Sequence, residues 1–243
     1  MLTLIALLST GCVSAKDTER SFARMELGQA YLLEGNVEGA IVELRDAVKT
    51  DPKSADAWDS LGLAYMARGA HEEAEKAFKK AIRVDKVYAG YRLNYAYLLQ
   101  KLGRRDEAVV QLLVAREDLT YREPAKVLNN LGWAYLQGEE TAAAIAVLEE
   151  AVRRQPNFCG AHYNLGAAYA EGDHVRKAVD RFEIVLEMCD DQFPEAALSA
   201  GVLLMDAGHV DEGATYLHLC LERWPDTPVA ARCREKLKAE GLL

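Results

Sequence analysis

Small residues recur along this chain at nearly constant spacing, and this period constrains the fold more than any other feature. Gly or Ala returns after steps of 34, 34, 36, 34 and 35 residues, at Gly28, Gly62, Ala96, Gly132, Gly166 and Gly201. Two further series keep the same steps, one small (Ala40, Ala74, Ala108, Ala144, Ala178, Gly213) and one bulky (Leu44, Phe78, Leu112, Leu148, Phe182, Leu217). Three registers with one spacing indicate an internal structural repeat.

The segment Trp58-x-x-Leu61-Gly62-x-x-Tyr65 resembles the signature of tetratricopeptide repeats. The resemblance implies six repeats of two antiparallel helices each, over residues 21–54, 55–88, 89–122, 125–158, 159–192 and 194–227. The predicted fold class is therefore all-α, a right-handed superhelical solenoid of tetratricopeptide repeats. In each repeat, the small residue of the first series lets the first helix approach the second.

Glycines and prolines mark the ends of the predicted helices. We expect the first helix of each repeat to end at a left-handed glycine, at Gly35, Gly69, Gly103, Gly138, Gly172 and Gly208. All six prolines fall at junctions between repeats, at Pro52, Pro124, Pro156, Pro194, Pro225 and Pro228. Residues 228–243 predict an amphipathic capping helix that covers the last repeat, so no separate catalytic domain is expected.

The first eleven residues form an uncharged, mostly apolar segment that ends at Cys12. It is too short to span a membrane and is typical of a secretion signal. Ser9-Thr10-Gly11 before Cys12 resembles the lipobox of bacterial lipoproteins. That pattern usually has Leu three positions before the Cys, where this chain has Ser9 directly after Leu8. The Lys or Arg that normally opens a signal is also missing. The resemblance implies a signal peptide over 1–11 and a lipidated tether over 12–20. The missing Lys or Arg leaves two alternatives, a signal that starts at Met1 and a longer natural signal that contains Met1. The alternative is an apolar tail that contains Cys12 by chance.

The residue after Cys12 bears on where a lipid-anchored protein would reside. In enterobacterial lipoproteins an Asp at this position retains the protein at the inner membrane, and here the position is Val13. The resemblance therefore implies the periplasmic face of the bacterial outer membrane, with diacylglycerol on the Cys12 thiol as the anchor.

Composition and motifs argue against several classes of function. The chain has 38 acidic and 29 basic residues and a net charge of −9, which disfavours binding along nucleic-acid phosphates. It lacks a Gly-rich phosphate loop, a nucleophile elbow and a dinucleotide fingerprint. Cys159-Gly160-Ala161-His162 has the spacing of a metal ligand pair, but no second pair accompanies it. We expect no enzyme activity, catalytic residue, metal, cofactor or small-molecule substrate.

The other four cysteines, Cys159, Cys189, Cys220 and Cys233, lie in the last third of the chain. Cys159 opens the first helix of the fifth repeat and Cys189 closes its second, so antiparallel packing brings these ends together. Cys220 faces the capping helix that carries Cys233. Both pairs could meet disulfide geometry. A secretion signal favours bond formation, because secreted proteins enter an oxidising compartment. The alternative is four buried thiols.

The first helices of the repeats should line a concave groove. By family position, the residues that point into it include Leu63, Met66, Leu93, Asn94, Tyr97, Asn129, Asn130, Trp133, Leu136, Tyr163 and Asn164. Asn94, Asn130 and Asn164 share one repeat position, where an amide can donate to and accept from a peptide backbone. Tyr97 and Trp133 share another position and should project side by side. The alternative for an aromatic residue at helical spacing is a place in the core.

A longer stretch resembles the type IV pilus biogenesis lipoproteins of the PilF/PilW group and the related Tgl protein. It comprises Leu93-Asn94-Tyr95-Ala96-Tyr97-Leu98-Leu99, the insertion Glu123-Pro124 and Asn129-Asn130-Leu131-Gly132, with Ala96 and Leu99 in place of the usual Gly and Cys. The resemblance implies a non-enzymatic pilotin that binds secretin subunits in its groove and promotes their outer-membrane localisation and multimerisation. The alternatives are a lipoprotein scaffold for outer-membrane-protein insertion or cell-wall enzymes, and a modifying enzyme whose site is not recognised.

Overall fold

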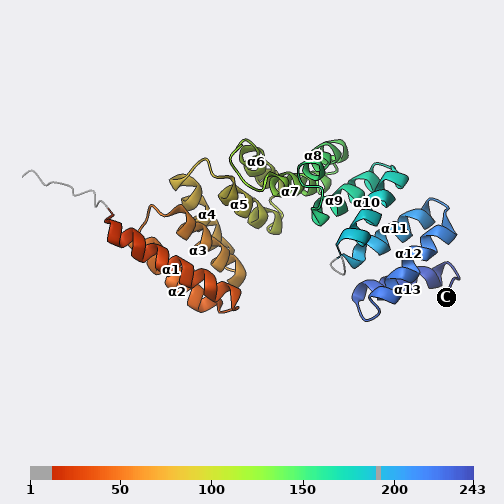
Figure 1. Ribbon diagram of the computed structural model, residues 1–243, viewed down its shortest axis with the longest axis horizontal. Coiled ribbons are helices and arrows are strands. Elements are labelled where there is room, and N and C mark those ends of the chain that lie inside the picture. Colours follow the sequence, from red (N-terminus) through yellow and green to blue (C-terminus); the bar gives the residue numbers. More distant parts are fainter. Residues whose placement is uncertain (1–12, 190–192) are drawn as a thin grey trace, which may run out of the picture. The chain divides into compact units, whose positions relative to one another are not determined.

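The computed structural model describes residues 13–189 and 193–243 of the chain. Within these residues the chain forms thirteen α-helices and no strand, which confirms the predicted all-α fold. The helices belong to two compact units, Met1–Leu102 and Gly103–Leu243, called unit 1 and unit 2 (Figure 1). The predicted signal peptide and Cys12 lie outside the described residues.

Unit 1 consists of two antiparallel helix pairs followed by a fifth helix. Its helices are α1 (Ala15–Leu33), α2 (Val37–Thr50), α3 (Ala55–Arg68), α4 (His71–Val84) and α5 (Ala89–Lys101). The pairs are α1 with α2 and α3 with α4, and α5 packs on both α4 and α3. We call the first helix of each repeat an A helix and the second a B helix, so α1, α3 and α5 are the A helices of unit 1.

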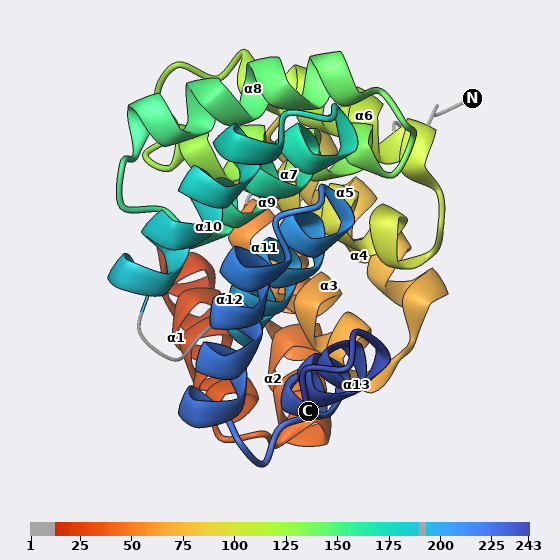
Figure 2. The same cartoon turned by 90° about the vertical axis from the view of Figure 1, so that its right-hand side faces the viewer.

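Unit 2 continues the pattern from a B helix to the end of the chain. Its helices are α6 (Arg105–Arg116), α7 (Pro124–Leu136), α8 (Thr141–Arg154), α9 (Cys159–Glu171), α10 (Val175–Met188), α11 (Pro194–Asp206), α12 (Val210–Arg223) and α13 (Pro228–Ala239). The A helices α7, α9 and α11 pair with α8, α10 and α12 in turn. The last helix, α13, packs on α12 and α11 (Figure 2).

Close approach of the two helices in a repeat depends on the small-residue series, as predicted. A Cβ atom at Gly62 would lie 2.5 Å from the ring of Phe78, and one at Gly166 would lie 2.7 Å from the ring of Phe182. Phe78 and Phe182 are fully buried, and so are the other members of the bulky series, Leu44, Leu112, Leu148 and Leu217. The glycines therefore give the bulky side chains room in a close-packed core.

The turn from an A helix to a B helix contains a residue in the left-handed conformation. The left-handed residues are glycines at the predicted positions 35, 69, 103 and 208. In the fourth and fifth repeats the prediction is wrong, because Glu139 and Asp173, both with φ 58°, adopt this conformation in place of Gly138 and Gly172.

Counting from the first small-residue series explains this correction. In each of these turns the left-handed residue stands seven positions after the small residue, whereas Gly138 and Gly172 stand only six positions after Gly132 and Gly166. The next N–H then bonds back to the A helix, for example from Glu140 to the Tyr135 carbonyl at 2.9 Å. This bond closes a Schellman-type turn, so the backbone geometry follows the repeat position and not the residue type.

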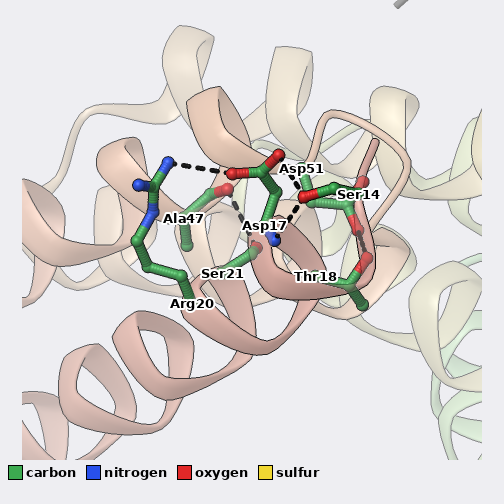
Figure 3. A network of polar contacts seen from close by, with 7 residues as sticks. All are labelled: Ser14, Asp17, Thr18, Arg20, Ser21, Ala47 and Asp51. Atoms are coloured by element: carbon green, nitrogen blue, oxygen red, sulfur yellow. Dashed lines mark hydrogen bonds and ion pairs between the residues drawn. The ribbon is translucent and has the colours of Figure 1, made fainter. Parts of the chain in front are cut away.

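The helical part of the chain begins earlier than the sequence predicted. Ser14 caps α1 by accepting a hydrogen bond from the Asp17 N–H at 3.1 Å. Ser21 donates to the Ala47 carbonyl at 2.9 Å, and Thr18 donates to Asp51 at 3.3 Å (Figure 3). Residues 15–20 are thus not part of a tether, as the sequence predicted, but the first turns of a helix that is docked on α2.

Unit 2 contains two disulfide bonds, and both join the cysteines that the repeat register paired. Cys159–Cys189 connects the start of α9 to the residue after α10, with 6.0 Å between the Cα atoms. Cys220–Cys233 connects α12 to α13, with 6.6 Å between the Cα atoms. The predicted disulfide pairing is confirmed: one bond joins the two helices of the fifth repeat, and the other fastens the capping helix to the sixth repeat.

Candidate binding faces

The predicted binding residues lie on A helices, on one face in each unit. In unit 1 this A face comprises the sides of α3 and α5 that carry Leu63, Met66, Asn94 and Tyr97. In unit 2 the A face comprises the sides of α7 and α9 that carry Asn129, Asn130, Trp133, Leu136, Tyr163 and Asn164, and it continues onto α11.

Tyr97 is the most accessible of the predicted residues in unit 1. Its side chain is 46% exposed, and the Lys101 ammonium nitrogen lies 5.8 Å from the centroid of its ring. Leu93, Leu63 and Met66 are half-buried. Tyr97 therefore offers an apolar ring with a neighbouring cation, and it can be truncated without opening the core.

Polar side chains join neighbouring A helices across each face. The amide nitrogen of Asn94 donates to Asp59 at 2.8 Å, and that of Asn164 donates to Asn129 at 2.9 Å. A third contact of this kind runs from Gln29 to Ser60 at 2.8 Å. The sequence predicted these asparagines for peptide binding, and the structure shows that two of their amide groups hold adjacent repeats together.

The third asparagine at this repeat position behaves differently. Asn130 donates to the Lys126 carbonyl at 2.8 Å, within its own helix. One turn later, Trp133 is half-buried on the same helix. Equivalent positions on successive A helices therefore have unlike partners, which residue type alone did not reveal.

Two other predicted residues of unit 2 contribute to its core. Leu136 and Tyr163 both pack against the buried cluster of the unit. The ring centroid of Tyr163 lies 5.7 Å from that of Phe182 and 5.8 Å from that of Phe193. The core alternative therefore applies in part to these two side chains, which are half-buried and still reach the surface.

A pocket of about 320 Å³ opens on the A face of unit 2. Tyr163 lines one side and Arg232 of α13 contributes a cation, while most of the remaining lining comes from α11, namely Glu195, Leu198, Ser199, Val202, Leu203 and Asp206. Of these residues, the sequence predicted only Tyr163 for binding. Ser199 occupies the repeat position of the three asparagines, and this was the signal that could have led to α11.

Asp59 is a buried carboxyl group on α3 that no sequence motif indicated. It is 9% exposed; one oxygen accepts the Asn94 bond, and the other has no hydrogen-bond partner in the described part of the chain. Burial raises the pKa of Asp59 to about 7; the Asn94 bond opposes this shift, and the nearby Asp56 carboxylate adds to it. Asp56 itself accepts a hydrogen bond from the Tyr91 hydroxyl at 2.6 Å. The A face of unit 1 thus contains a group that titrates near neutral pH.

The metal-like pair Cys159 and His162 has other partners. Cys159 is disulfide-bonded, and His162 Nε2 lies 2.9 Å from the Pro156 carbonyl oxygen. Burial lowers the pKa of His162. Over residues 13–189 and 193–243, no group of three or more His, Cys, Asp or Glu side chains is placed to hold a metal ion. No helix in those residues has the length and apolarity needed to cross a membrane.

The fold and the sequence comparisons define the class of protein. Family models described as TPR repeat and tetratricopeptide repeat match residues 28–69, 55–86 and 125–158. The helix pairs, the close-packed glycines and these matches agree. The described helices form a tetratricopeptide-repeat fold, and these three segments match tetratricopeptide-repeat families.

Among proteins of this class, the chain is similar to the type IV pilus assembly protein PilF of Pseudomonas aeruginosa. The two are 34% identical over 167 residues, which is 65% of this chain and 66% of the relative. A solved structure of PilF from a Pseudomonas aeruginosa study aligns with a TM-score of 0.79 and 26% identity, covering 91% of this chain and 99% of that chain.

Two further similarities show the fold alone or match only a small part of the relative. The crystal structure of PilW, a type IV pilus biogenesis factor, aligns with a TM-score of 0.80 at 21% identity, covering 87% of this chain and 97% of that chain, and shows the shared fold. Superkiller complex protein 3 of Homo sapiens is 32% identical over 143 residues, 57% of this chain and 9% of that protein. The sequence matches thus span just under two thirds of PilF and a small part of the human protein.

Proposed function

We propose that this chain is a non-enzymatic pilotin of a type IV pilus machine. It binds secretin subunits and promotes their localisation and multimerisation in the bacterial outer membrane. The observation that carries the proposal is the similarity to PilF, 34% identity in sequence and a structural alignment over 91% of this chain. Tetratricopeptide arrays act by holding other proteins on the surfaces of their stacked helices.

The A faces supply the contacts that such a protein needs. Tyr97 presents a 46% exposed ring in unit 1, and the pocket of about 320 Å³ in unit 2 combines apolar walls with Arg232. Aromatic side chains and arginines are the residue types that dominate protein interfaces. An unassembled secretin segment would place apolar side chains on these surfaces and thereby be kept from aggregating.

In this proposal, a lipid on Cys12 anchors the protein on the periplasmic face of the outer membrane. Three residue steps separate Cys12 from Ala15, the first residue of α1. An extended chain of this length reaches about 10 Å. Because α1 is docked on α2 through Thr18 and Ser21, unit 1 would be held close to the membrane surface, where the secretin assembles.

The test removes two of the aromatic side chains on the A faces. In cells that carry Tyr97→Ala with Trp133→Ala, we expect secretin multimers to fall at least about tenfold and monomers to accumulate, because truncating an interface anchor costs about 2 kcal/mol or more. The protein should stay folded and abundant, since neither side chain is buried. Leu119→Ala, at a 91% exposed residue between α6 and α7, is the control. Normal multimer levels in the double variant would reject Tyr97 and Trp133 as secretin contacts.

The same cells test the anchor. Cys12→Ser removes the residue that carries the acyl chains, and stable membrane binding of this kind needs more than one such chain. The variant should therefore be found in the soluble periplasmic fraction at normal abundance. Recovery of the Cys12→Ser protein in the outer membrane would reject the lipid anchor and would leave the binding faces to be judged by the aromatic variants alone.

A further inference from the structure

Unit 1 contains an apolar pocket that is separate from the residues proposed to bind the secretin. It lies between the B helices α2 and α4, against the A helix α3, and has a volume of about 430 Å³. Its apolar lining consists of Val48, Trp58, Leu61, Tyr65 and Ala77. The Trp58 indole N–H donates to the Pro52 carbonyl at 3.0 Å, so the polar edge of that ring is already satisfied.

Three cations surround this pocket. Arg45 of α2 and Lys76 and Lys80 of α4 line it and are exposed. None of the three forms an ion pair with another of the described residues. Glu73 contributes one carboxylate to the lining, so the pocket carries a local excess of positive charge in a chain whose net charge is −9.

One junction of the same kind in unit 2, with two B helices against an A helix, is closed and its charges are paired. It lies between α6, α7 and α8, and its cavity measures only about 10 Å³. Glu150 stands at the repeat position of Lys80, and it pairs with Arg116 at 3.1 Å and with Arg154 at 2.7 Å. Since the repeat can close this junction, its architecture does not require an open pocket with unpaired cations.

We propose that this pocket of unit 1 binds an acidic peptide segment of a partner protein. A bulky apolar side chain of the segment would insert against Trp58, and flanking Asp or Glu residues would pair with Arg45, Lys76 and Lys80. Complementary charge on the rim of an interface speeds encounter and selects the partner, while an anchor side chain buried in a pocket supplies most of the binding energy. The pocket provides both elements, and neither a free anion nor an uncharged segment would use both.

A membrane surface and the chain's own N-terminus fit this pocket less well. The exposed surfaces of α2 and α4 also carry Glu38, Glu72 and Glu73, which a flat anionic bilayer would have to approach. The first eleven residues of the chain contain no acidic side chain, so they cannot pair with the three cations. A peptide is narrow enough to place its carboxylates on the three cations and to avoid these acids, which is why a protein segment is the favoured occupant.

The first measurement uses the purified chain and a fluorescein-labelled peptide, Asp-Glu-Ala-Phe-Ala-Asp-Glu. Fluorescence anisotropy should show binding that weakens as salt is raised, since exposed ion pairs are screened. Replacing the Phe by Ala, or all four acids by Asn and Gln, should each weaken binding about tenfold. Binding that tolerates both peptide changes would overturn the proposal.

The second measurement reverses the charge of the pocket. Lys76→Glu with Lys80→Glu should weaken binding of the acidic peptide at least about tenfold and create binding of its basic counterpart, Lys-Lys-Ala-Phe-Ala-Lys-Lys. Lys53→Glu with Lys86→Glu makes the same change in net charge at exposed residues outside the pocket and should leave both peptides unaffected. The gain of basic-peptide binding shows that the variant is folded.

Three results would overturn the inference. They are equal loss of acidic-peptide binding in the two double variants, no gain of basic-peptide binding in the pocket variant, and tighter binding to phosphatidylglycerol vesicles than to the peptide with the same dependence on Lys76 and Lys80. Because this measurement involves neither the A faces nor Cys12, its failure would not bear on the proposed pilotin function.

Discussion

Unit 1 and unit 2 are built from the same repeat, yet the polar, charged and cysteine side chains of the two units have different partners. Unit 2 contains two disulfide bonds and closes the junction beside Glu150 with two ion pairs. Unit 1 has a single cysteine, Cys12, an open pocket beside Lys80 and the buried carboxyl of Asp59. Since the small and bulky series pack alike in both units, the difference arises at positions that the repeat leaves variable.

Because of this difference, different changes in conditions should destabilise the two units. In a repeat protein, stability is close to a sum of local terms and of contacts between neighbours. A change in redox state should therefore act on unit 2, and a rise in pH from 4 to 8 should destabilise unit 1 through Asp59. The following predictions test that division.

Reduction of the disulfides should produce the largest effect. The bonded cysteines are 30 residues apart for Cys159–Cys189 and 13 residues apart for Cys220–Cys233. Each bond restricts the unfolded chain and should contribute about 3 kcal/mol. Hydrogen exchange with and without a reductant measures this locally, and protection should fall in α9 to α13 while α1 to α4 keep theirs.

The control for this prediction removes one bond by substitution. Cys220→Ala with Cys233→Ala should weaken protection of α13 without any reductant, and the remaining reductant effect should be confined to α9 and α10. A uniform loss of protection over both units would contradict the division, because it would mean that the units unfold as one.

The second prediction concerns pH and the buried Asp59. Burial raises its pKa from the usual 3.8 to about 7, so the folded protein binds this proton more tightly than the unfolded chain does. The resulting stabilisation is complete below pH 4 and is lost as pH rises towards 7, by about 2–4 kcal/mol. Asp59→Asn should remove this dependence, and the variant should therefore be the more stable protein at pH 8 and about equal to the wild type at pH 4.

Urea unfolding at several pH values, combined with hydrogen exchange in α3 and α5, measures this effect. Glu72→Gln, at an exposed carboxylate of the same unit, is the matched control and should change little. If Asp59→Asn and the wild type lose stability in parallel between pH 4 and pH 8, another group causes the pH dependence.

The sequence predicted the features that the repeat position determines. The close contact of Gly62 with Phe78 and the two disulfide pairs follow from counting residues along antiparallel helices. Position fixes which helix ends meet and which side chains face each other, and no knowledge of the exact crossing angles is needed. The helical fold and the cysteine pairing were accessible for this reason.

Features that depend on several helices at once were not accessible. The partner of Asn94 is Asp59 on a neighbouring A helix, and whether two such side chains meet depends on the angle between the helices. The pocket beside Trp58 is bounded by three helices, so its volume is set by side chains far apart in the sequence. The early start of α1 was missed because residues 16–20 are polar, and their docking relies on hydrogen bonds such as Thr18 to Asp51.

The last and smallest effect concerns the turns between A and B helices. In unit 1 the left-handed residues are Gly35 and Gly69, whereas two turns of unit 2 use Glu139 and Asp173, both at φ 58°. A residue with a side chain loses about 1–2 kcal/mol of stability in this conformation. Replacing it by glycine recovers only part of this, because glycine also raises the conformational entropy of the unfolded chain. Glu139→Gly should therefore stabilise unit 2 by about 0.5–1 kcal/mol, and Asp173→Gly somewhat less, since Asp tolerates the left-handed region better than Glu does.

The reverse change in unit 1 separates backbone strain from lost contacts. A Cβ at Gly35 or Gly69 would meet nothing within 4 Å, so Gly35→Ala should cost about 1 kcal/mol through the backbone alone. Thermal unfolding of the Glu139→Gly and Gly35→Ala variants should give shifts of opposite sign and similar size. If Gly35→Ala destabilises while Glu139→Gly has no effect, the Glu139 side chain must contribute contacts that offset its strain. The turns of the two units would then differ in more than the residue that occupies the left-handed position.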